Sequence, residues 1–183
     1  MKAVQMISQV LTFWFDENGP EKWFIKDPVF DNEISNKFLE LYNQLTLGKH
    51  GEWRFSARGC LAEIIVLDQF SRNMYRDDAK AFSADLQALE CLNYGISMAY
   101  DKEFSQVERN FFYLPFEHSE DKLDQEKSIH YFTENGDTNT LDYAIKHKVI
   151  IDRFGRYPHR NEILGRPSTE EERVFLQGPG SAF

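Results

Sequence analysis

Several side chains that bind anions or move protons lie close together near the end of the chain. Arg153, Arg156, His159 and Arg160 belong to the segment Asp152-Arg-Phe-Gly-Arg-Tyr-Pro-His-Arg-Asn161. A guanidinium group binds carboxylates and phosphates through paired N–H donors, and an imidazole exchanges protons near neutral pH. The segment, with Asn161 as a further polar group, therefore predicts a site for a small anion or polar ligand.

The same segment also has a purely structural interpretation. Gly155 suits the left-handed conformation that ends a helix, and Tyr157-Pro158 suits a turn. The arginines would then only pair with nearby carboxylates. The segment holds more cationic and titratable groups than capping needs, which favours the ligand site and leaves the structural interpretation as the alternative.

A second group of polar residues lies in the most apolar stretch of the sequence, residues 57–74. Asp68 and Arg72 are four residues apart, and so are Gln69 and Asn73, a spacing that places each pair on one face of a helix. A buried charge is unfavourable unless it is fully paired. These residues therefore predict either an ion pair that fastens two helices or one wall of a ligand site.

A third group occurs in Leu114-Pro-Phe-Glu-His-Ser-Glu-Asp121. Pro115 is expected to end one helix, and Ser119 is expected to cap the next. Glu117 and His118 would then lie at a helix N-terminus, which lowers the pKa of a histidine and allows an acid/base pair. The alternative is that these residues only cap the helix.

His147 lies on the apolar face of a predicted helix, where a histidine is more often a core residue than a ligand-binding one. We include it among the candidate ligand-binding residues; it would form a metal site with His118, Glu117 and Asp68 only if folding brought these residues together. The sequence has no H-E-x-x-H, paired C-x-x-C or EF-hand motif. No metal and no cofactor is therefore expected.

Apolar residues recur with helical spacing, and glycines and prolines separate the periodic segments. The pattern predicts an all-α protein of roughly seven to nine helices, with Asp31 as an N-cap and Thr169-Glu-Glu-Glu172 as a capping box. We expect one domain over residues 1–183. Its last residues, 178–183, are expected to form a flexible or docked tail.

Composition restricts the function further. The 183 residues are 42% hydrophobic and carry a formal net charge of −9, so the chain can form a core but lacks a basic footprint for nucleic acid or anionic membranes. No signal peptide and no membrane-spanning segment is evident. We therefore expect a cytoplasmic protein in which Cys60 and Cys91 are reduced thiols.

Taken together, long motifs give the chain a recognisable pattern. They are Thr12-Phe-Trp-Phe15, Trp23-Phe-Ile-Lys-Asp-Pro28, Leu67-Asp-Gln-Phe-Ser-Arg-Asn73, the two segments at 114–121 and 152–161, and Leu164-Gly-Arg-Pro-Ser-Thr169. In this order they resemble the bacterial DUF924 family of uncharacterised proteins. The resemblance implies antiparallel helical hairpins in a tetratricopeptide-like arrangement and no established activity. Lys148 departs from the arginine that the family commonly has there, which weakens any role for a guanidinium at that position.

These observations leave three hypotheses open. In the first, a closed site binds a small anionic molecule. Glu117 or His118 acts as the base and His159 as a second acid/base group. The anion is held by arginines, namely Arg72, Arg153, Arg156 and Arg160. In the second, a tetratricopeptide-like groove binds a peptide carboxylate. In the third, the polar groups only fix helix geometry. The first is preferred, with Arg156 and Arg160 as the main anion ligands; the oligomeric state is left open.

Overall fold

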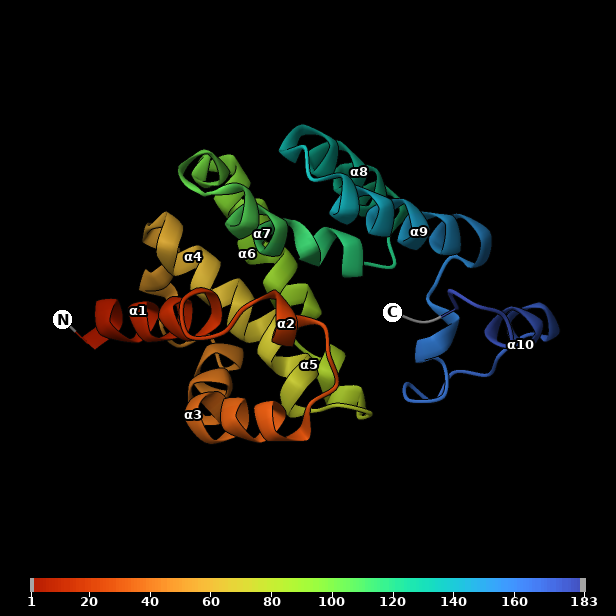
Figure 1. Ribbon diagram of the computed structural model, residues 1–183, viewed down its shortest axis with the longest axis horizontal. Coiled ribbons are helices and arrows are strands. Elements are labelled where there is room, and N and C mark those ends of the chain that lie inside the picture. Colours follow the sequence, from red (N-terminus) through yellow and green to blue (C-terminus); the bar gives the residue numbers. More distant parts are fainter. Residues whose placement is uncertain (1, 182–183) are drawn as a thin grey trace.

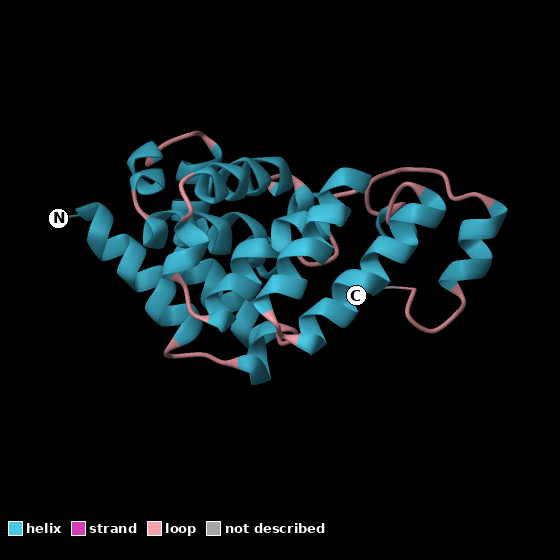
Figure 2. Cartoon of the chain, turned by 90° about the horizontal axis from the view of Figure 1, so that it is seen from above, coloured by secondary structure: helices cyan, strands magenta, loops and turns pink. Residues whose placement is uncertain are grey.

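The computed structural model describes residues 2–181. Within these residues the chain is helical and contains no β-strand (Figure 2). Eight of the described α-helices have seven residues or more, which confirms the predicted all-α class. The molecule is elongated, with α1 (Lys2–Phe15) at one end and α10 (Glu170–Leu176) at the other (Figure 1).

The remaining elements follow in chain order. The α-helices are α2 (Pro20–Trp23), α3 (Pro28–Thr46), α4 (Ala57–Ile64), α5 (Ser71–Met74), α6 (Asp85–Ser97), α7 (Gln106–His118), α8 (Lys122–Asn135) and α9 (Thr138–Phe154). The 3-10 helices are η1 (Gly51–Phe55), η3 (Ala79–Phe82), η4 (Tyr100–Glu103) and η5 (Pro158–Arg160). A π-helical segment, η2 (Ile65–Phe70), joins α4 to α5.

The segment α4–η2–α5 is the central element of the fold. It packs against α1, α3, α6 and α7, and several of its apolar side chains, among them Leu61, Ile64 and Ile65, have no exposed surface. Helices α7, α8 and α9 then pack on one another in succession, and α8 and α9 lie side by side (Figure 1). The chain therefore surrounds one apolar helix and extends as a row of consecutive helices.

Aromatic rings fill the core between α1, α3, α7 and the central segment. Trp14 contacts Phe70 and Phe111 edge-on, with ring centroids 5.5 Å apart in both pairs. Such edge-to-face pairs contribute about 0.5–1.5 kcal/mol beyond the burial of their area. A smaller cluster of Ile150, Ile151 and Tyr157 lies under α9 and η5.

Two predicted helix boundaries are wrong. The N-cap of α3 is Asp27, whose side chain accepts a hydrogen bond from the Val29 amide, because Pro28 takes the first helical position. Asp31 lies one turn inside α3, where it accepts hydrogen bonds from Asn73 and Arg76. The helical spacing of Phe82, Leu86, Leu89 and Ile96 predicts one helix there, but residues 82–96 belong to two elements, η3 and α6.

The prediction that Pro115 ends a helix is also wrong. Helix α7 continues through Pro115 to His118, and Ser119 follows as its C-cap. A proline inside a helix costs about 3 kcal/mol, and here the burial of every residue from Phe111 to Glu117 offsets it. The N-cap of α8 is Asp121, whose carboxylate accepts hydrogen bonds from the Leu123 and Asp124 amides.

Other boundaries are confirmed. Gly155 ends α9 with a φ of 68°, the left-handed conformation that glycine adopts without strain. Thr169 and Glu172 form the capping box of α10. Of the tail, residues 178–181 are described as turns and bends, and residues 182–183 lie outside the described part.

Two further features are the state of the cysteines and the hydropathy of the helices. Cys60 on α4 and Cys91 on α6 are free thiols, both buried, with sulfur atoms 3.0 Å apart, a juxtaposition that the sequence did not predict. Within residues 2–181, the helices are too short or too polar to cross a membrane.

The burial of the central segment yields a stability prediction. We expect Ile64→Ala to lower the free energy of unfolding by about 2–5 kcal/mol, because it leaves a cavity among residues that cannot collapse. The same substitution at Ile145, which is 46% exposed on α9, is the matched control. Urea unfolding monitored by circular dichroism measures both, and a loss below about 1 kcal/mol at Ile64 would contradict the assigned packing.

Candidate functional site

The candidate site is built on the π-helical segment η2. A π-helix widens the turn, and such segments are rare and frequent at functional sites. Here the wide turn carries Asp68, whose side chain is fully buried, and Gln69. The Ser71 hydroxyl donates to the Asp68 carbonyl oxygen at 3.1 Å. The segment therefore places a carboxylate deep in the protein, facing the C-terminal end of α7.

Asp68 and His118 form the centre of the site. His118 Nδ1 lies 2.8 Å from Asp68 Oδ1, and Gln69 Nε2 donates to Asp68 Oδ2 at 2.6 Å. Burial alone would raise the pKa of Asp68, but the charge of Arg72 and the interactions with His118 and Gln69 outweigh it and hold the pKa well below its usual range. Because an ionised carboxylate only accepts hydrogen bonds, Nδ1 of His118 must carry the proton.

Arg72 connects this centre to α6. Its Nη1 lies 3.2 Å from Asp68 Oδ1, which confirms the predicted pair. The guanidinium also binds both carboxylate oxygens of Asp85, at 3.1 and 3.2 Å. The parallel pairing of Gln69 with Asn73 is wrong, because Asn73 turns toward α3 and donates to Asp31.

Arg160 brings the C-terminal part of the chain into the site. Its guanidinium lies between the rings of Phe82 and Tyr157, 4.6 and 4.5 Å from their centroids. Nη1 donates to the His118 carbonyl oxygen at 3.1 Å and lies 3.7 Å from Asp85 Oδ2. Nε is buried and has no hydrogen-bond partner among the described residues. Burial and the nearby Arg72 lower the pKa of Arg160.

Glu117 and His147 lie on the inner side of the same cluster. Glu117 Oε1 is 3.4 Å from His147 Nδ1, which donates to the Tyr143 carbonyl oxygen at 2.9 Å. Burial, with the charge of Asp68, raises the pKa of Glu117 to about 8. Burial lowers the pKa of His147 to about 3. Both groups are therefore neutral at pH 7.

The cause that we expected for a lowered histidine pKa is wrong. Glu117 and His118 end α7 and do not open the next helix, so no helix N-terminus acts on them. Burial and the charge of Arg72 lower the pKa of His118, while Asp68 opposes them. The imidazole is consequently neutral at pH 7, with its proton on Nδ1 and a lone pair on Nε2.

Residues that the sequence did not single out hold this geometry. Tyr157 donates its hydroxyl proton to the Glu117 carbonyl oxygen and accepts from Gln125 Nε2. Glu120 accepts hydrogen bonds from the Tyr157 amide and from Arg166. Tyr157 lies inside the basic segment, where the sequence predicts only a turn. Nothing in the residues around Asp85 indicates that it belongs to a site.

Most of the basic segment lies outside the cluster. Arg153 binds Glu171 at 2.8 Å on the surface, and Arg156 binds both carboxylate oxygens of Glu172 at 2.6 and 2.8 Å. These pairs fasten the end of α9 and the loop that follows it to α10. The structure therefore separates Arg156 from Arg160, which we had expected to act together.

Asn161 and His159 are similarly placed around the site. Asn161 is buried and binds Ser168 and Arg166. His159 faces Tyr157, with ring centroids 5.6 Å apart, and burial and the charge of Arg160 lower its pKa to about 4. Both residues support the loop that carries Arg160.

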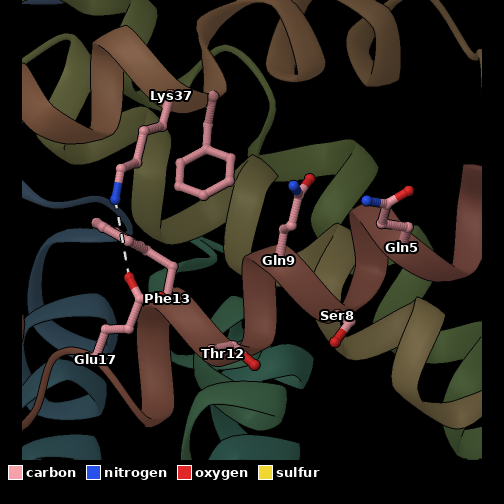
Figure 3. Close-up of a pocket in the computed structure, with 8 residues that line it drawn as sticks. Gln5, Ser8, Gln9, Thr12, Phe13, Glu17 and Lys37 are labelled. Atoms are coloured by element: carbon pink, nitrogen blue, oxygen red, sulfur yellow. Dashed lines mark ion pairs between the residues drawn. The ribbon is translucent and has the colours of Figure 1, made fainter.

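Two hollows in the surface involve other residues. One lies between α1 and α3, where Lys37 reaches across to Glu17 at 3.8 Å beside Phe13 and Gln9 (Figure 3). The other is lined by Tyr42, Tyr75 and Lys80, among others. Neither hollow is lined by a residue of the three motifs.

The fold and the cluster define an all-α protein with a buried arginine–aspartate–histidine network where α7 and η5 meet the central segment. Residues 10–180 match the family described as bacterial protein of unknown function, DUF924, and the chain belongs to that family. It is similar to the solved structure titled protein of unknown function ATU0120 from Agrobacterium tumefaciens, with 36% identity and a TM-score of 0.92. That similarity covers 96% of this chain and 99% of the other. None of the curated proteins matches.

The raised pKa of Glu117 predicts a pH-dependent stability. The pKa is about 8 in the folded protein, against 4.5 for an ordinary glutamate. Between these values the folded state holds a proton that the unfolded state lacks, so stability falls as pH rises, by about 1.4 kcal/mol per pH unit. The introduced glutamine would not titrate, so the Glu117→Gln variant should not show this loss of stability. Its free energy of unfolding should therefore rise relative to that of the wild type between about pH 4.5 and 8.

Urea unfolding at a series of pH values tests this. His147 and His159 act with the opposite sign below about pH 6.5, because their lowered pKa values disfavour the protonated folded state. Their contributions cancel when the free energy of unfolding of the wild type is subtracted from that of the variant at each pH. Glu126→Gln, on the exposed face of α8, controls for the substitution itself. A difference that stays constant with pH would contradict a protonated Glu117.

Proposed function

We propose that the Asp68–His118–Arg160 cluster binds a small anion and exchanges protons with it. One observation carries the proposal: the contacts within the cluster do not satisfy all of its hydrogen-bonding groups. Arg160 Nε is buried without a hydrogen-bond partner among the described residues, and His118 binds Asp68 through Nδ1, which leaves Nε2 available for a ligand. A ligand would supply the missing partners.

The cost of those groups argues against a purely structural role. A buried polar group without a hydrogen bond costs about 1–3 kcal/mol, and more if it is charged. A network kept only to fix helix geometry would be more stable with apolar residues of the same volume. Arg156–Glu172 shows what a structural pair looks like in this chain, since both carboxylate oxygens are bound.

The guanidinium donors of Arg160, and not a net charge of the cluster, suit an anion. Asp68 and Asp85 balance Arg72 and Arg160, and Glu117 is neutral. Arg72 binds both aspartates through Nη1 and Nη2, whereas Arg160 keeps a buried Nε without a partner among the described residues. Its guanidinium also packs on the rings of Phe82 and Tyr157, which leaves little conformational entropy to lose on binding.

The burial of the site favours a small ligand over a peptide. The side chain of Arg160 is 7% exposed and that of His118 is 15% exposed, too little surface to bind an extended chain. Peptide binding in a tetratricopeptide-like groove remains the alternative, and the open hollow between α1 and α3 is where it would be sought (Figure 3).

The same geometry provides acid/base groups for an enzyme. Asp68 orients His118 so that Nε2 can accept a proton, as a carboxylate orients the histidine of a catalytic dyad. Glu117, with a pKa of about 8, can donate one at neutral pH. This supports proton transfer to or from a bound anion.

Isothermal titration of the protein with phosphate and acetate tests the proposal. We expect Arg160→Gln to weaken binding by roughly tenfold to a hundredfold, the effect of losing a charged hydrogen bond. Arg160→Lys keeps the charge but loses the planar donors, so its affinity should lie between those of the wild type and Arg160→Gln. Arg153→Gln, which removes a surface pair, is the matched control.

Circular dichroism establishes that each variant is folded. Phosphate or acetate binding that Arg160→Gln leaves at wild-type strength would contradict the assigned role of Arg160. A wild-type protein that binds neither anion would favour the structural interpretation.

A further inference from the structure

We propose that the ligand of this cluster is an oxyanion that carries its own hydroxyl donor, as hydrogen phosphate and 2-hydroxycarboxylates do. The inference rests on the proposed function and specifies the chemistry of its ligand. It follows from the hydrogen-bonding character of the two groups that would face the anion, Arg160 and His118.

The orientation of the His118 proton is the first step. Asp68 is an acceptor at both oxygens, because Gln69 donates to one and His118 lies 2.8 Å from the other. The proton of a neutral imidazole must therefore sit on Nδ1. Nε2 then presents a lone pair and can only accept a hydrogen bond.

The charge state of His118 is the second step. The titratable and charged groups around its ring come from each element packed against it. They are Asp68 on η2, Arg72 on α5, Asp85 on α6, Glu117 on α7, His147 on α9 and Arg160 on η5. Both aspartates are already shared with the arginines, so their charge is largely compensated. Burial and Arg72 then keep the imidazole neutral.

The position of Arg160 is the third step. Its Nη1 donates to the main-chain carbonyl oxygen of His118 at 3.1 Å, so the guanidinium lies beside the main chain at this residue. An anion at Arg160 that extends to the imidazole of His118 would meet a cationic donor and a neutral acceptor together. The remaining guanidinium N–H groups can bind only acceptors.

This combination distinguishes between oxyanions. Sulfate and acetate offer only acceptors, so an oxygen placed against His118 Nε2 would meet a lone pair. Hydrogen phosphate and glycolate can accept from Arg160 and donate a hydroxyl proton to Nε2. Sites built to bond a hydroxyl group reject analogues that lack it, because a buried polar group is left unpaired.

Isothermal titration with matched anions tests the inference. Phosphate is compared with sulfate, and glycolate with acetate, at about pH 7, where His118 and Glu117 are both neutral. We expect phosphate, glycolate or both to bind about tenfold or more tightly than their partners, the effect of about 1.4 kcal/mol. The pair that shows the preference identifies a phosphate or a carboxylate ligand.

Lowering the pH provides a second readout that needs no variant. Protonation of His118 turns Nε2 into a donor, so acetate should bind more tightly and the preference for glycolate should shrink as pH falls below about 6.5. His118→Phe keeps a ring but removes the acceptor, and should abolish the preference. Arg153→Gln should retain it.

The outcomes separate this inference from the proposed function. Equal affinity within both pairs at about pH 7 would overturn the hydroxyl requirement while leaving an anion site. Absence of binding for all four anions would overturn both. A preference for sulfate or acetate would mean that Nε2 is already a donor, and would overturn the assigned state of His118.

Discussion

The burial of one carboxylate determines much of this structure. Asp68 has no exposed surface and lies in the middle of the most apolar segment of the chain. Taking such a charge out of water costs several kcal/mol unless the surrounding groups compensate it. Gln69, Arg72 and His118 provide that compensation from three different elements. Arg72 in turn recruits Asp85, and the His118 carbonyl recruits Arg160.

The same requirement explains why the widened turn and the internal proline are tolerated. The π-helical turn aims Asp68 toward α7, and α7 runs through Pro115 until it presents His118. A π-segment and a helical proline each cost stability. Both features supply the two ends of one hydrogen bond, Asp68 to His118. Local irregularity in the backbone therefore coincides with the polar cluster, as it does at functional sites.

Local signals in the sequence predicted the parts of the fold that depend on neighbouring residues. The Asp68–Arg72 pair follows from a spacing of four, and the glycine at 155 and the capping box at 169–172 follow from chain chemistry. Partners far apart in sequence left no such signal. Arg156 and Arg160 look alike in the sequence, yet Glu172 neutralises one and aromatic rings enclose the other.

Boundary errors had a similar origin. Asp27 and Asp31 are both suitable caps, and the choice depended on Pro28 occupying the first turn. Whether Pro115 ended its helix depended on how deeply that helix is buried. Tertiary packing decided both, and it also reversed the explanation for the lowered His118 pKa from a helix terminus to burial beside Arg72.

The protonation state of His118 tests the central claim most directly. Nitrogen-15 NMR of labelled protein distinguishes the two neutral tautomers of histidine from the cation. The account predicts that His118 at pH 7.5 is neutral, with its proton on Nδ1. It also predicts that added phosphate shifts the Nε2 resonance, because the phosphate hydroxyl donates a hydrogen bond to Nε2. A cationic ring at that pH, or a proton on Nε2, would contradict the arrangement of Asp68, His118 and Arg160 as an anion site.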